Sequence, residues 1–122
     1  MKKALVLGFY HRCNLGDDMF MEAIPLLLKD FQCTFECMDD YDNTSSDYDV
    51  VICGGGDIFN DYFLPKIQNI KSPIYLVGVG IPYESMITTQ WVNMFDHIFL
   101  RNTTDISKVS QLIGYKYVHY LP

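Results

Sequence analysis

Short apolar runs alternate with polar, helix-compatible segments along the whole chain, and this alternation constrains the fold more than any other feature. Such runs are too short for most helices but are typical of buried strands. Parallel strands with apolar residues on both faces require helices packed on the sheet. The predicted strands are residues 4–7, 34–38, 48–53, 74–79, 97–100 and 117–120.

The segments between the strands carry helical signals. We predict helices over Met19–Phe31, within 57–70 with Pro65 near the first turn, over Thr88–Phe95, and from a Thr103 cap to Ile113 before Gly114. The chain is therefore expected to be one α/β domain over residues 1–122, a doubly wound, Rossmann-like parallel sheet with helices on both faces. The polar connection 39–47 is too short for a helix, which places strand two beside strand one and predicts the order 2-1-3-4-5-6.

Charge and cysteine usage narrow the function classes. The 15 acidic and 9 basic residues give a net charge of −6 without a Lys/Arg cluster, so a nucleic-acid partner is not expected. The acids between Asp39 and Asp49 lack calcium-loop spacing, and we predict no metal site. The four cysteines form no C-x-x-C pair, and no apolar run approaches the roughly 18 residues of a membrane helix. We expect a cytoplasmic protein with free thiols that does not span a membrane.

Unusual residues follow four of the predicted strands. In a parallel sheet these positions share the carboxyl edge, where open α/β folds bind ligands. Glycines there allow close approach of backbone to a ligand. The candidates are Asn14, Gly16 and Asp17 after the first strand, Gly54, Gly55, Gly56 and Asp57 with Asp61 after the third, Gly80 after the fourth, and Arg101 after the fifth.

Two common functions of this fold are disfavoured. The first loop has glycine at Gly8 and Gly16 but lacks the G-x-G-x-x-G order of dinucleotide sites. A phospho-receiver domain needs an aspartate after the third strand, where Cys53 and Gly54 stand.

The strand-end motifs together resemble the polysaccharide pyruvyl transferase family, in order and spacing across nearly the whole chain. They are Asn14-Leu15-Gly16-Asp17, the segment 48–57 with Asp61, Gly78-Val79-Gly80-Ile81-Pro82, and Arg101 followed by a helix ending at Gly114. The resemblance implies one half of a glycosyltransferase-B-like architecture, with a second similar domain beyond residue 122. It also implies transfer of a pyruvyl group from phosphoenolpyruvate, the donor substrate, to a glycan, without a cofactor.

The resemblance suggests roles for the candidate residues. Arg101 and His11 are the catalytic candidates, as an anion-binding cation and as an acid or anion donor. Asn14, the glycines and the carboxylates are assigned to substrate, mainly the acceptor glycan. The cations Arg101 and Arg12, with His11, are too few for a trianionic donor, so we expect the 122-residue chain alone to be inactive.

Three alternatives remain open at this stage. The chain is compatible with half of a nucleotide-sugar glycosyltransferase, with a non-catalytic binding module, or with self-association in place of a second domain. Self-association would use apolar surface near Phe9, Tyr10, Phe59 and Tyr62. His97 and His119 are interpreted as structural.

Overall fold

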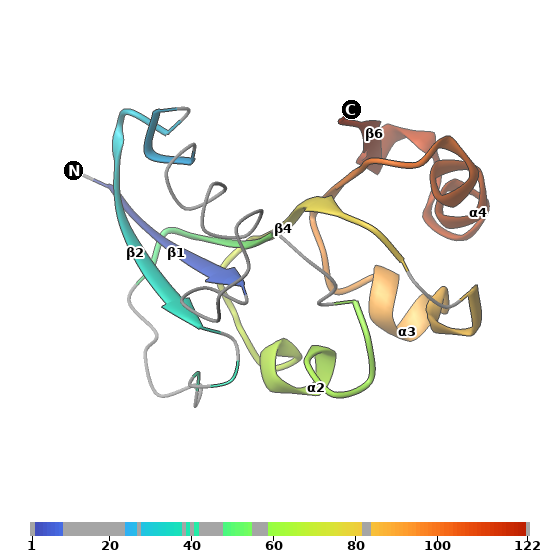
Figure 1. Cartoon of the computed structure of the whole chain (residues 1–122), viewed down its shortest axis with the longest axis horizontal. Coiled ribbons are helices and arrows are strands. Elements are labelled where there is room, and N and C mark those ends of the chain that lie inside the picture. The colour runs from blue at the N-terminus through green and yellow to red at the C-terminus, as the bar shows by residue number, and fades with distance from the viewer. Residues whose placement is uncertain are drawn as a thin grey trace.

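The structure is a computed structural model that describes residues 2–8, 24–26, 28–37, 39, 41, 48–54, 59–81 and 84–121. Within these residues, six parallel strands form one sheet in the order β2-β1-β3-β4-β5-β6 (Figure 1). The strands are β1 (Lys2–Gly8), β2 (Phe31–Cys37), β3 (Val50–Gly54), β4 (Ile74–Val79), β5 (His97–Leu100) and β6 (Val118–Tyr120). The α/β class, the parallel sheet and the strand order are confirmed.

Most differences from the predicted elements lie at their boundaries. Phe31 begins β2, so the predicted helix cannot extend to it; residues 24–26 are helical and a turn at Lys29 and Asp30 follows. Gly54 is the last residue of β3 and pairs with Val77, so this glycine does not break the strand as predicted.

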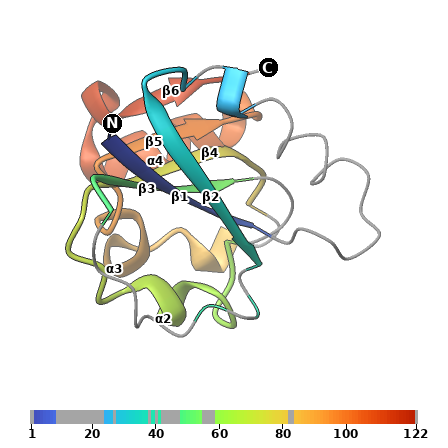
Figure 2. The same cartoon turned by 90° about the vertical axis from the view of Figure 1, so that its left-hand side faces the viewer.

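Three α-helices of the described chain cover one face of the sheet, together with short 3-10 turns. They are α2 (Leu64–Ile67), α3 (Thr89–Val92) and α4 (Thr103–Ile113), and the 3-10 helices are η2 (Glu84–Met86) and η3 (Tyr115–Tyr117). In Figure 2, α2 and α3 lie on one side of the strands and the light-blue segment 24–26 lies on the other. Helical structure thus occurs on both faces, as predicted.

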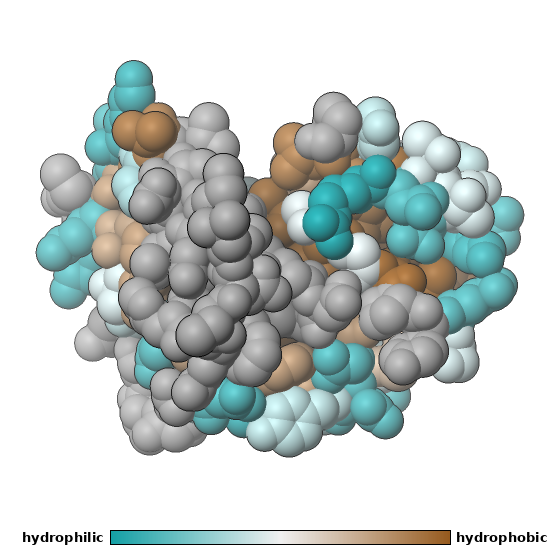
Figure 3. Space-filling model, viewed as in Figure 1, coloured by the Kyte–Doolittle hydropathy of each residue, from teal (hydrophilic) through white to brown (hydrophobic). Residues whose placement is uncertain are grey.

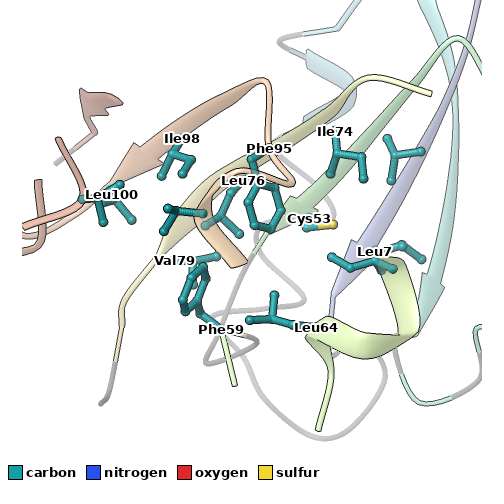
Figure 4. Close-up of a cluster of buried hydrophobic side chains, with 14 of the residues drawn as sticks. Leu7, Cys53, Phe59, Leu64, Ile74, Leu76, Val79, Phe95, Ile98 and Leu100 are labelled. Carbon is teal, nitrogen blue, oxygen red and sulfur yellow. The ribbon is translucent and has the colours of Figure 1, made fainter. Parts of the chain in front are cut away.

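The main core forms where these helices meet the sheet (Figure 4). Leu76, Ile98 and Leu100 contribute fully buried side chains from β4 and β5, and Leu64 and Ile67 contribute them from α2. A smaller cluster of Val6, Ile24 and Ile52 lies on the opposite face. Burying one such side chain contributes roughly 1.5–3 kcal/mol, so the larger cluster dominates the packing free energy.

The apolar sequence of β4 predicted burial on both faces of this strand. Its face opposite α2–α4 is only partly buried. Ile74, Leu76 and Val79 are buried, but Tyr75 and Val77 are half-exposed. Gly78, with a φ of 68°, forms a bulge where the register with β5 shifts, and this lets Val79 face the main core. The half of the sheet from β4 to β6 is therefore densely covered only on the face of α2–α4.

The N-cap of α4 is one residue earlier in the chain than predicted. Asn102, not Thr103, is the N-cap, and its Oδ1 accepts a hydrogen bond from the Thr104 amide at 2.8 Å. Gly114 ends the helix with a φ of 91°, as predicted. Arg101 consequently lies directly between the end of β5 and the cap of α4.

The apolar surface proposed for self-association is only partly present. Tyr62 is 60% exposed, but Phe59 is completely buried and its ring lies 6.3 Å from that of Phe95. The expectation was wrong for Phe59 because this side chain enters the main core beside Val79 (Figure 4). Phe9 and Tyr10 lie outside the described residues.

Candidate functional site

The carboxyl edge of the sheet is the candidate site, because all the strands are parallel and end there. Two of the proposed residues meet at this edge. Gly80 follows β4 and Arg101 follows β5, and a Cβ atom placed on Gly80 would lie 3.1 Å from Nη2 of Arg101. The guanidinium group therefore lies against the backbone of the loop after β4, where any side chain larger than hydrogen would crowd it.

The Arg101 side chain is exposed, whereas Gly80 is partly covered. Within the described part of the chain, Arg101 forms no ion pair. A guanidinium group carries a permanent charge and presents a planar fork of N–H donors. Gly80 and Arg101 together thus provide a positively charged group with free donors at the edge where doubly wound sheets bind ligands.

An ion pair connects the two segments that follow these residues. Lys108 of α4 lies 3.0 Å from Glu84 of η2, with side chains 36% and 74% exposed. Exposed pairs of this kind typically contribute between 0 and about 1 kcal/mol. The pair helps to hold the segment after Gly80 near the helix that follows Arg101, and no sequence pattern predicted it.

Gly54 and Asp61 occupy different surroundings from this pair. Gly54 is buried in the β3 ladder, so its backbone is engaged in the sheet. Asp61 is exposed in the turn before α2 and forms no ion pair with Arg101. The turn is fixed by its neighbour Asn60, whose Oδ1 accepts hydrogen bonds from the Tyr62 and Phe63 amides at 3.0 Å each.

Asn60 and Asn102 are two polar residues that the sequence analysis did not single out. Each uses a side-chain oxygen to satisfy backbone amides at the start of a turn or helix near the carboxyl edge. Their signal was an Asn shortly before a helical segment, which is a common N-terminal pattern.

The remaining candidates lie outside the described residues. They are His11, Asn14, Gly16, Asp17, Gly55, Gly56 and Asp57.

Cys53 is not a plausible nucleophile. Cys53 precedes Gly54, and its side chain is completely buried in the main core (Figure 4). Burial raises the pKa of its thiol to about 12, because the apolar surroundings disfavour the thiolate. Cys33, Cys37 and Cys53 are all free thiols, and no group of three or more metal-ligating side chains occurs among the described residues.

The face of the molecule in Figure 3 carries both hydrophilic and hydrophobic residues. Hydrophilic groups cover much of the region over α4, and hydrophobic groups gather toward the centre of the molecule. No helix formed by the described residues is long and apolar enough to span a bilayer.

Comparisons of the chain with family models, curated proteins and solved structures gave no match.

Proposed function

We propose that the chain is the acceptor-side half of a pyruvyl transferase that acts on a glycan. The observation that carries the proposal is the contact of Arg101 with Gly80 at the carboxyl edge of the sheet. It places an exposed guanidinium group beside a backbone position without a side chain. This combination suits a carboxylate or phosphate ligand that approaches the backbone closely.

The chemistry of pyruvyl transfer explains why such a cation is useful. Two C–O bonds form between the enol carbon of phosphoenolpyruvate and two sugar hydroxyls, and the bond from that carbon to the phosphate oxygen breaks. One hydroxyl proton converts the methylene group to a methyl group, and the other leaves with phosphate. Negative charge therefore moves onto phosphate while a carboxylate remains, and a guanidinium group beside them stabilises both.

The other proposed residues complete the acceptor side. Carboxylate and amide oxygens of Asn14, Asp17 and Asp61 are suited to accept hydrogen bonds from sugar hydroxyls. Asp61 is exposed, which is compatible with this role. Further cations for the trianionic donor would come from a second, similar domain across a cleft.

A nucleotide-sugar glycosyltransferase is the second candidate. The same exposed Arg101 would neutralise a diphosphate, so this observation supports both classes of donor. A non-catalytic, anion-binding module is the outcome that remains if neither donor binds.

Thermal protection distinguishes these candidates. The intact protein, meaning this chain together with the second domain that the proposal expects, is heated with one of three ligands at equal ionic strength. The ligands are phosphoenolpyruvate, a nucleotide sugar and inorganic phosphate. We expect phosphoenolpyruvate to raise the melting temperature most and Arg101→Ala to remove that rise, because a ligand stabilises only the state that binds it. Protection by the nucleotide sugar alone would support the glycosyltransferase, and protection by neither would contradict both.

A further inference from the structure

Two histidine side chains form a direct contact on the sheet face opposite α2–α4. Nδ1 of His97 in β5 lies 3.0 Å from Nε2 of His119 in β6. Both residues are half-buried, and their strands are neighbours in the sheet. This contact involves none of the residues proposed for the strand-end site.

The ring geometry is that of a hydrogen bond. The ring centroids are 5.2 Å apart, so they are separated by 2.2 Å more than the two nitrogens, and the ring planes differ by 28°. This difference matches the distance from the centre of an imidazole ring to its nitrogen, counted once for each ring. The two nitrogens therefore point almost directly at each other. One ring donates its N–H and the other accepts with an unprotonated nitrogen.

Aromatic rings surround the pair. Tyr75 packs edge-on against His97 at 5.5 Å, Tyr117 lies 5.9 Å from His97, and Phe99 stacks with His119 at 4.6 Å. These rings restrict the rotation of both imidazoles, so the hydrogen bond is held in place from β4, β5 and η3.

Charged residues lie close to the pair in sequence, on η3 and directly before β5. Lys116 of η3 places its ammonium group 5.7 Å from the Tyr117 ring, so the nearby formal charge on that element is positive. Asp96 precedes His97, but its Oδ2 accepts a hydrogen bond from the Ile74 amide at 2.8 Å. Among the described residues, no carboxylate forms an ion pair with either histidine.

Strand β6 lies at the edge of the sheet. It is a three-residue edge strand that pairs with β5 alone, and Val118 is its buried residue. The Leu121 amide adds one hydrogen bond to the Leu100 carbonyl at 2.8 Å. The His97–His119 link adds a side-chain attachment to the backbone pairing with β5 and to the packing of Val118 in the main core.

We propose that the His97–His119 hydrogen bond is a pH-sensitive clasp that fastens β6 to the sheet. With one proton between the two facing nitrogens, the bond is intact. Protonation of both rings removes the acceptor and places two positive charges at a distance where they repel. Acid then releases β6 and uncovers Val118 together with the β5 residues behind it. Histidine is the side chain suited to such a switch near physiological pH.

Amide hydrogen exchange of the 122-residue chain tests the clasp. Exchange is followed in a peptide covering residues 115–121 and in one covering β4, at about pH 7.5 and about pH 5.5, after correction for the intrinsic effect of pH. We expect protection of β6 to fall relative to that of β4 at the lower pH, because protonation of both rings removes the hydrogen bond between them. Equal changes in β6 and β4 would overturn the proposal.

Matched variants assign the effect to the pair. His119→Gln and His97→Gln retain a hydrogen-bonding amide that does not titrate, and each is expected to abolish the pH-dependent loss. His11→Gln, which changes the third histidine, should retain it. Persistence of the loss in both clasp variants would contradict the proposal.

If a clasp variant fails to fold, nitrogen NMR of the wild-type imidazoles decides the question. A scalar coupling between Nδ1 of His97 and Nε2 of His119 that disappears as β6 loses protection supports the clasp. The absence of this coupling at the higher pH overturns it.

Discussion

Arg101 lies so close to Gly80 that a single methyl group on the glycine would reach to 3.1 Å from its Nη2 atom. The contact joins the loops that follow two neighbouring strands, β4 and β5. It involves the far end of a flexible side chain, so it is a constraint on where the positive charge lies more than on whether the chain folds.

Gly80→Ala is therefore expected to weaken anion binding while leaving stability within about 1 kcal/mol of wild type. The added Cβ displaces the guanidinium group by a few tenths of an ångström or forces a new rotamer. Calorimetric titration of the intact protein with phosphoenolpyruvate measures the first effect and the melting temperature measures the second.

Gly114→Ala is the matched control for this substitution. Gly114 has a φ of 91° and nothing within 4 Å of its Cβ position, so alanine there is strained without a steric neighbour. It should lower the free energy of unfolding by about 1 kcal/mol and leave anion binding unchanged. The reverse pattern in the two variants would show that Gly80 does not position Arg101.

Asn102→Ala should destabilise the chain by about 1 kcal/mol, because the Thr104 amide loses its side-chain acceptor. Thr103→Ala is the adjacent control and should change stability much less, since Thr103 is already inside the helix. Urea denaturation of the three proteins provides the comparison. A larger loss for Thr103→Ala would restore the cap assignment that the sequence alone favoured.

Phe59→Ala should cost about 3–5 kcal/mol, the usual range for deletion of a buried aromatic side chain. Phe59 is fully buried, whereas Tyr62, three residues away, is 60% exposed. Tyr62→Ala should cost less than about 1 kcal/mol, through loss of its contacts with Phe63 and Lys66. Similar values for the two variants would contradict the different burial of these rings.

The burial of Cys53 predicts how the free energy of unfolding depends on pH. Burial raises the pKa of the Cys53 thiol from its ordinary value of 9.0 to about 12. At a pH between these two values, the thiol is ionised in the unfolded chain but neutral in the folded one. The unfolded state then binds fewer protons, so the free energy of unfolding falls as pH rises above 9.0. Cys53→Ala should reduce this alkaline loss relative to wild type. An identical alkaline slope in both proteins would show that the thiol is not buried as described.

The strand order could be predicted because the local sequence patterns of the strands and of their connections are consistent with one another. The apolar runs of β4 and β5 have their predicted bounds because nothing in their flanks competes with strand formation. The short connection 39–47 correctly placed β2 beside β1. Phe31 was misassigned because a terminal apolar residue satisfies helical spacing and begins a strand equally well.

Other features depend on contacts between distant segments, which no local pattern records. Val77 lies on the face opposite the main core and is only partly buried, whereas the Gly78 bulge turns Val79 toward the core. His97 and His119 were interpreted as structural from the sequence, and their mutual hydrogen bond depends on the register of β5 with β6. At the site, the sequence predicted that Gly80 and Arg101 share an edge, but not that they touch.

Phosphate release by the intact protein, supplied with phosphoenolpyruvate and a panel of sugar acceptors, tests the central claim most directly. The account predicts acceptor-dependent release that falls about 10²-fold in Arg101→Ala, the usual effect of losing a group that stabilises transition-state charge, with partial recovery in Arg101→Lys. Absence of release with every acceptor, together with absence of phosphoenolpyruvate binding by calorimetry, would contradict it.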